Sequence, residues 1–264
     1  MNMKKTSNNP IGVFDSGLGG LTVLKHLLHR LPNENFIYLG DLANLPYGNK
    51  SQKNIIDYSR KCVQFLNSKN VKSIIVACNT ASSCAYNIIK ESTNIPVFDV
   101  ISPCVDEVVN SSATKVAILG TEKTIESNIY SKSIKIKKSN IKVYNKACPL
   151  FVPIVEEGLE GTKIAHSIID YYLKDIKARQ VDQLVLGCTH YPVLIEDLKK
   201  YFGKSISILH SGPIIAKNLS LDFEKKHKNR SKIYYYVTDS PQRFEKYGSK
   251  FLSKKIKSVN LVTI

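Results

Sequence analysis

The chain has 264 residues, 43% of them hydrophobic, and this length suits two domains of ordinary size. Its 38 basic and 22 acidic residues give a net charge of +16, but the lysine clusters (residues 135–142, 224–232 and 253–257) carry no zinc-finger, RNP or basic-zipper signature. No apolar run is long enough to cross a bilayer, and no apolar segment follows the two lysines near the N-terminus. We therefore expect a cytoplasmic protein that does not bind membranes.

Apolar runs and helical repeats alternate along the first 100 residues. A short strand (11–14) runs into a glycine-rich turn and a helix with leucines at helical spacing. A second strand (36–39), a loop, and a helix from about 51 to 67 come next, and Ser51 is placed to cap that helix. A third strand ends at Cys78, a helix continues through about 89, and a fourth strand covers 96–100. This order predicts strand–helix–strand units with parallel pairing.

The same alternation starts again after Pro103. Predicted strands cover 115–119, 141–144, a run ending at Cys188, 206–209 and 233–237. Predicted helices run from 121 to about 134, over 149–158, from 162 to 176, after Pro192, from about 213 and from 240. We expect an α/β protein with two pseudo-symmetric domains, mainly parallel sheets and an active site in the cleft between them. Residues 1–98 with 212–264 would form the first domain, and 99–211 the second.

Two cysteines, 110 positions apart, each stand where a predicted strand passes into a helix. Cys78 lies in IIVACNTASS and Cys188 in LVLGCTHYPVL. Ligands bind at this edge of parallel sheets, and the positive end of a helix favours thiolate over thiol. Polar residues follow both cysteines and can bind an anion at the two helix N-termini; they are Asn79, Thr80, Thr189 and His190. His190 could also exchange a proton with the thiol of Cys188.

The other four cysteines, Cys62, Cys84, Cys104 and Cys148, are interpreted as small buried hydrophobic residues in a reduced protein. There is no CxxC pair, so a zinc site is not expected.

Two loops could add polar groups to the cysteine edge. DSGLGG (15–20) lacks the spacing of a Walker or dinucleotide loop, so it is first of all a tight turn. Asp15 and Ser16 nevertheless lie at a strand end, where Asp15 could accept a thiol proton or bind an ammonium group. In the turn PYG, backbone N–H groups and the hydroxyl of Tyr47 could hold a carboxylate.

Two cysteines without a metal, nicotinamide or pyridoxal motif leave two main chemistries. Nucleophilic catalysis needs one cysteine and a base, whereas proton transfer on two faces of a substrate needs two matched acid–bases. Two similar halves that face each other favour proton transfer.

Six segments together resemble glutamate racemase, a cofactor-independent member of the aspartate/glutamate racemase superfamily. They are FDSGLGGLTV, GDLANLPYG, VACNTAS, ACPLFVPIVEEG, LVLGCTHYP and VTDSPQRFE, in this order and across nearly the whole chain. The resemblance implies two α/β domains, no cofactor or metal, and Cys78 and Cys188 as the catalytic acid–bases. Cys78 would act on D-glutamate and Cys188 on L-glutamate, supplying D-glutamate for peptidoglycan.

The resemblance also assigns supporting roles. Asp15 and His190 would assist the thiols, together with a glutamate of VEEG, either Glu156 or Glu157, of which we name Glu157. Substrate would be bound by residues that match the family motifs or lie beside them: Asp15, Ser16, Tyr47, Gly48, Asn79, Thr80, Thr121, Thr189 and His190. Thr124 is a further secondary contact, and we expect a homodimer.

Some positions depart from the family pattern and alternatives stay open. Leu42 and Asn44 replace the usual threonine and arginine, and His210 replaces an aspartate. The nearest alternative is a racemase of aspartate or another amino acid, against which THYP after the second cysteine argues. Binding of DNA or gyrase is another, for which the charge of +16 leaves room.

Overall fold

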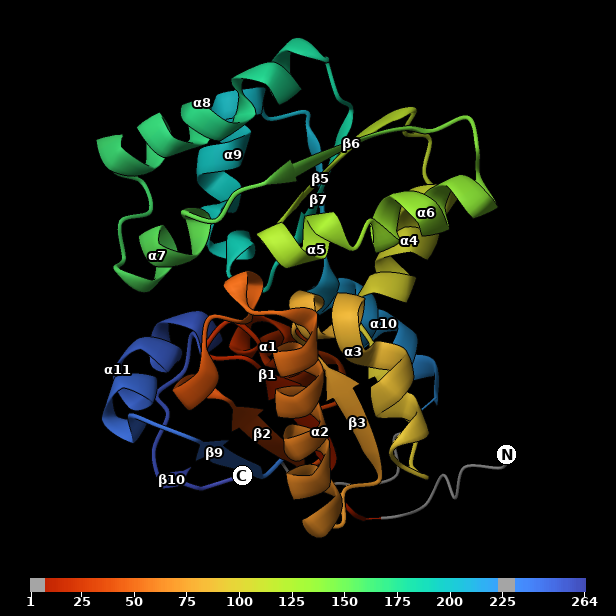
Figure 1. Cartoon of the computed structure of the whole chain (residues 1–264). Coiled ribbons are helices and arrows are strands. Elements are labelled where there is room, and N and C mark those ends of the chain that lie inside the picture. Colours follow the sequence, from red (N-terminus) through yellow and green to blue (C-terminus); the bar gives the residue numbers. More distant parts are fainter. Residues whose placement is uncertain (1–7, 223–230) are drawn as a thin grey trace.

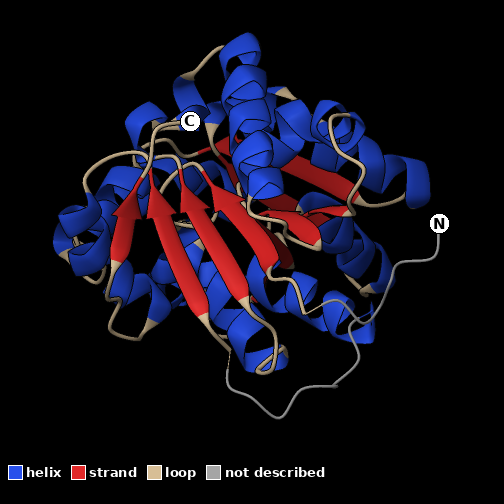
Figure 2. Ribbon diagram, turned by 90° about the horizontal axis from the view of Figure 1, so that it is seen from below, coloured by secondary structure: helices blue, strands red, loops and turns tan. Residues whose placement is uncertain are grey.

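The computed structural model, which describes residues 8–222 and 231–264, consists of two β-sheets, each covered by helices (Figures 1 and 2). Within each sheet the strands are parallel. The first sheet has the strand order β10-β9-β2-β1-β3-β4, and the second has the order β6-β5-β7-β8. The strands are β1 Ile11–Asp15, β2 Phe36–Gly40, β3 Ser73–Val76, β4 Val97–Asp99, β5 Lys115–Gly120, β6 Lys142–Ala147, β7 Gln183–Gly187, β8 Ser207–His210, β9 Ile233–Val237 and β10 Val259–Leu261. The predicted α/β class with parallel sheets is confirmed.

Helices pack on both faces of each sheet, because successive strand residues point to opposite sides. In β1, Val13 belongs to the core cluster under α1 and α11, whereas Phe14 belongs to the cluster under α2 and α3. The helices are α1 Leu21–Arg30, α2 Gln52–Ser68, α3 Asn79–Glu91, α4 Ile101–Asn110, α5 Glu122–Glu126, α6 Ile129–Lys137, α7 Phe151–Glu156, α8 Lys163–Ala178, α9 Ile195–Phe202, α10 Ser211–Asp222 and α11 Pro241–Leu252.

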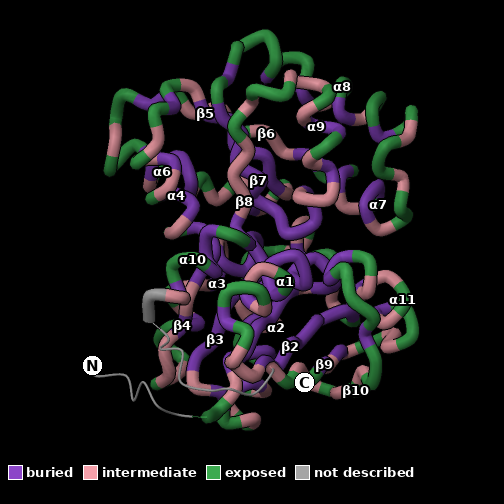
Figure 3. Tube along the Cα trace, turned by 180° about the vertical axis from the view of Figure 1, so that it is seen from behind, coloured by how far each residue is buried: buried purple, intermediate pink, exposed green. Residues whose placement is uncertain are grey.

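The chain builds β1 to β4 of the first sheet, then the whole second sheet, and then returns to add β9 and β10 to the first. One core cluster contains residues from both sheets, and residues coloured as buried continue between the two sheets (Figure 3). We refer to the sheets with their helices as the first and second halves. The division into residues 1–98 with 212–264 and 99–211 stays a prediction.

Three local predictions differ from the structure. Helix α4 is absent from the elements that the sequence predicts. Pro103 lies in its first turn, where the missing N–H leaves no helical hydrogen bond unmade. The predicted helix from 121 to 134 is two helices, since Asn128 adopts a left-handed conformation with φ of 55°. Strand β10 was missed because it is a short edge strand with largely exposed residues.

Most of the lysine-rich stretch 224–232 lies outside the described residues. In the part that the structure describes, no helix is both long and apolar enough to cross a membrane.

Candidate active site

Both cysteines of the strand–helix junctions line one pocket between the two halves. Cys78 follows β3 of the first sheet, and Cys188 follows β7 of the second. Ten residues predicted from the sequence line this pocket: Ser16, Tyr47, Gly48, Cys78, Asn79, Thr80, Thr121, Cys188, Thr189 and His190. The pocket is thus built from the carboxyl ends of parallel strands, where α/β proteins bind ligands.

Cys78 is the N-cap residue of α3. Its Sγ accepts a hydrogen bond from the backbone N–H of Ala81 at 3.4 Å and donates one to Ser16 Oγ at 3.5 Å. Burial, and then the negative charge of Asp15, raise the pKa of the Cys78 thiol to about 12, against the smaller effect of those two hydrogen bonds. At neutral pH Cys78 is therefore a protonated thiol, suited to donate a proton.

Cys188 has a different partner, the imidazole of His190. The Sγ lies 4.0 Å from His190 Nδ1, and His190 Nε2 lies 3.2 Å from Glu156 Oε1. Burial alone would lower the pKa of His190, but hydrogen bonds to Cys188 and Glu156 and their negative charges outweigh it and raise this pKa to about 10. At neutral pH His190 is therefore protonated and places a cation beside Cys188.

Hydrogen-bond donors suited to a carboxylate lie beside the thiols. The amide Nδ2 of Asn79 is buried and has no hydrogen-bond partner in the part of the chain that the structure describes, while its Oδ1 accepts a hydrogen bond from Tyr130 at 2.7 Å. The hydroxyls of Thr80, Thr121 and Thr124 form a cluster with O–O distances of 2.9 to 3.4 Å. A buried donor without a partner costs free energy, so the Asn79 amide favours a ligand acceptor.

Asp15 lies beneath the pocket wall. It is fully buried, and it accepts hydrogen bonds from Gly17 N–H at 2.9 Å and Thr189 Oγ1 at 3.3 Å. Burial raises the pKa of Asp15, although the charge of His190 acts in the opposite direction. Asp15 does not line the pocket, so its contact to a substrate ammonium stays a prediction, whereas its charge affects Cys78 directly.

Tyr47 is held by a carboxylate that sequence reasoning missed. Its hydroxyl donates to Asp41 Oδ2 at 2.6 Å, and Asp41 also accepts from Thr238 and Asn44. Because this hydroxyl is already used, Gly48 and the backbone are the better candidates for ligand contact in this loop. Asp41 follows β2 as Asp15 ends β1, which was a usable signal.

Of the two glutamates in VEEG, Glu156 and not Glu157 lies beside His190. Glu156 lines the pocket and contacts His190, whereas Glu157 is exposed and lies at the C-terminal end of α7. Neighbouring residues on a helix point about 100° apart, so only one of the two can face His190. Thr124 contributes through the threonine cluster and does not itself line the pocket.

The other cysteines stand apart from this chemistry. All six are free thiols; Cys62, Cys104 and Cys148 are buried as expected, but Cys84 is half-exposed, which differs from the prediction. Within residues 8–222 and 231–264, no three His, Cys, Asp or Glu side chains are grouped as metal ligands.

A pocket that is lined by two thiols and by hydrogen-bond donors for a carboxylate, between two α/β halves, is typical of one class of isomerase. Residues 11–219 match the Asp/Glu/hydantoin racemase family, and the chain belongs to that family. It is 42% identical over 247 residues to a glutamate racemase of Aquifex aeolicus, covering 93% of this chain and 95% of the relative.

Solved structures agree with this assignment. A glutamate racemase of Francisella tularensis in complex with D-glutamate superposes with a TM-score of 0.89 at 38% identity, over 97% of this chain and 98% of that one. A glutamate racemase isoform of Bacillus anthracis gives a TM-score of 0.91 at 34% identity with the same coverage. The resemblance inferred from the six sequence segments is confirmed.

Proposed function

We propose that this protein interconverts L- and D-glutamate by a two-base mechanism without a cofactor. The observation that carries the proposal is the single pocket that holds Cys78 and Cys188, one from each half, beside the unpaired amide of Asn79. Full-length similarity to glutamate racemases supports glutamate as the substrate.

The two thiols would act on opposite faces of the substrate Cα. With L-glutamate bound, Cys188 as thiolate removes the Cα proton while Cys78 as thiol delivers a proton to the other face, giving D-glutamate. The reverse reaction exchanges these roles. The Asn79 amide, the threonine hydroxyls and the N-terminus of α3 stabilise the negative charge that develops when the proton leaves.

Isotope exchange tests this mechanism. In deuterium oxide at early times, D-glutamate formed from L-glutamate should carry deuterium at Cα, while the remaining L-glutamate should not. Return of the original hydrogen to the product would show a single base. Cys78→Ser and Cys188→Ser should each abolish racemisation, because a hydroxyl is far less acidic than a thiol; near-normal activity of either variant would refute the assignment.

Substrate selectivity separates glutamate from the alternatives. Fixed donors left unpaired by a shorter or uncharged side chain disfavour binding, so aspartate and glutamine should be poor substrates. Equal rates with aspartate would assign a different substrate. Chelators should leave turnover unchanged, whereas loss of activity with EDTA and recovery with metal would contradict a cofactor-independent reaction.

Membership of the family supports two further proposals, one on the cellular role and one on the assembly. We propose that the product D-glutamate supplies peptidoglycan synthesis and that the enzyme is a homodimer. A deletion strain should then require D-glutamate for growth, and light scattering should give twice the 29.6 kDa chain mass. Growth without D-glutamate would exclude an essential role in its supply, and the chain mass alone would exclude the dimer.

A further inference from the structure

An ion pair joins the two halves next to the acid–base residues. Arg243 lies on α11, which packs on the first sheet through Phe244, fully buried against Tyr38 with ring centroids 5.6 Å apart. Arg243 Nη2 reaches Glu156 Oε2 at 3.3 Å, and Glu156 lies on α7 of the second half. Because Phe244 anchors α11, the position of the adjacent Arg243 backbone is fixed.

Glu156 uses its two oxygens for two different partners. Oε2 accepts from Arg243, and Oε1 pairs with Nε2 of His190, whose Nδ1 faces Cys188. The result is a line of alternating charges when the imidazole is protonated and the thiol ionised. A carboxylate held at both oxygens cannot rotate without breaking one of these contacts, so its orientation toward His190 is defined.

We infer that Arg243 is a positioning residue for the Cys188 side of the reaction, holding the carboxylate of Glu156 so that Glu156 orients His190 toward the thiol. This inference rests on the proposed two-base function. It also implies that the acid–base groups of the second half are complete only when the first half is docked against them.

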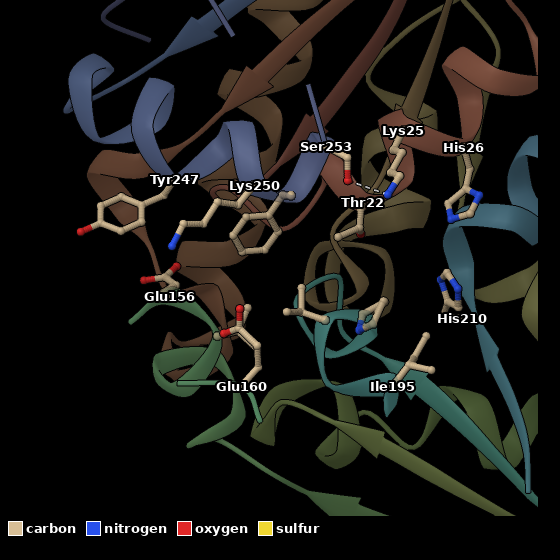
Figure 4. A pocket seen from close by; sticks show the side chains of 14 residues that line it. Thr22, Lys25, His26, Glu156, Glu160, Ile195, His210, Tyr247, Lys250 and Ser253 are labelled. Atoms are coloured by element: carbon tan, nitrogen blue, oxygen red, sulfur yellow. Dashed lines mark hydrogen bonds between the residues drawn. The ribbon is translucent and has the colours of Figure 1, made fainter. Parts of the chain in front are cut away.

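Because Glu156 is largely buried, its ion pair with Arg243 affects the charge state of the carboxylate. Its side chain is only 12% exposed, so an oxygen without Arg243 would be poorly solvated. Burial alone would raise the pKa of Glu156, but the hydrogen bond and charge of His190 and the charge of Arg243 together lower it. The guanidinium also lies 5.9 Å from the Tyr247 ring, and Figure 4 shows Tyr247 and Lys250 on the same side of Glu156. Removal of Arg243 should therefore raise the pKa of Glu156.

Charge removal at Arg243 tests the inference, with a matched control on the same helix. Arg243→Met should lower kcat/KM by roughly three- to sixfold, since the guanidinium is half-exposed, and move the acid limb of the kcat/KM–pH profile to higher pH. Arg243→Lys keeps the charge and should restore the acid limb. Lys246→Met removes one charge from an exposed position of α11 and should leave both rate and profile unchanged.

Alkylation gives a second measurement that does not depend on turnover. Iodoacetamide labelling of each cysteine is followed by peptide mass spectrometry near pH 6. Arg243→Met should slow the labelling of Cys188 about threefold and leave Cys78 unchanged, because only Cys188 is linked to Glu156 through His190. A general packing defect would affect both cysteines.

The possible failures are distinguishable. If wild-type protein racemises glutamate but Arg243→Met keeps the wild-type acid limb and Cys188 labelling, the inference is wrong and the function stands. An equal change in Arg243→Met and Lys246→Met would show a general charge effect and also overturn it. Wild-type protein without racemase activity would refute the proposed function itself.

Discussion

Replacing Gly19 by alanine should damage the Cys188 side of the site by displacing Thr189 or His190, with the side chains of the site themselves left unsubstituted. Gly19 lies in the turn after β1, and a Cβ built there would stand 2.3 Å from Thr189 Oγ1 and 2.5 Å from His190 Nδ1. Both distances are far below van der Waals contact, so Thr189 or His190 must shift. Gly17→Ala is a matched control in the same turn, because its nearest neighbour would be Leu45 at an ordinary 3.8 Å.

The size of the effect follows from the cost of such a clash. Inserting a methyl group into packed surroundings costs about 1–3 kcal/mol. If this free energy is needed to keep His190 in its position beside Cys188, kcat/KM falls roughly five- to 150-fold. Glutamate racemisation would be followed by chiral chromatography, and thermal denaturation would report the fold. Gly19→Ala with a near-wild-type rate, or Gly17→Ala with an equal loss, would refute the steric argument.

Three further outcomes follow from the site and its surroundings. Glu156→Gln should lower kcat/KM at least tenfold, while the kcat/KM of Glu157→Gln should stay within about twofold of the wild type. Similar losses in the two variants would contradict the assignment of Glu156 alone as the helper carboxylate. Iodoacetamide should label Cys188 before Cys78 at pH 8, because burial raises the pKa of Cys78 to about 12; peptide mapping with the reverse order would contradict the assigned resting state. Burial, and then the charge of a neighbouring histidine, lower the pKa of His210 from 6.5 to about 4, so its neutral form stabilises the fold above pH 6.5 and this contribution is lost as pH falls toward 4. In His210→Gln the urea midpoint of unfolding should fall less between pH 6.5 and pH 4 than in the wild type. An unchanged pH dependence of this midpoint would exclude a contribution of His210 to stability in acid.

The cysteine junctions were predictable because their signal is local. An apolar run followed by small polar residues specifies both a buried strand end and a helix cap. Cys78 stands at that point in the structure as the N-cap of α3, whereas Cys188 follows the end of β7 and is separated by two residues from a short 3-10 helix, Tyr191–Leu194. Parallel pairing then brings strand ends to one edge of each sheet. No long-range information is needed for these steps, which is why the class of fold and most pocket-lining residues could be inferred.

The carboxylates were harder to assign because their roles depend on tertiary contacts. Helix α7 has only six residues, too few for apolar spacing to show whether Glu156 or Glu157 faces inward. The partner of Glu156, Arg243, is 87 positions away and on the other half. Asp41 and Tyr47 are close in sequence, but nothing local indicates that the tyrosine hydroxyl is used by the carboxylate instead of by a ligand.

His210 shows how a departure from a family pattern acquires a physical meaning only in the structure. It stands at the end of β8, with its ring 5.4 Å from that of His26 on α1 of the first half. Its Nδ1 is buried without a hydrogen-bond partner among the residues described. Two imidazoles at this distance tolerate protonation poorly, and we therefore expect His210 to affect the stability of the fold in acid.

The unequal surroundings of the two thiols are compatible with a reaction that has no preferred direction. The enantiomers of glutamate have equal free energies in solution, so kcat/KM must be the same from either side, however different Cys78 and Cys188 are. Under the proposed mechanism, the form that accepts L-glutamate has Cys78 as thiol and uses Cys188 as the base, and the raised pKa of the Cys78 thiol favours this form. The form that accepts D-glutamate has the opposite protonation and is less populated. The asymmetry should therefore appear in the separate values, with kcat and KM differing between the two directions by the same factor.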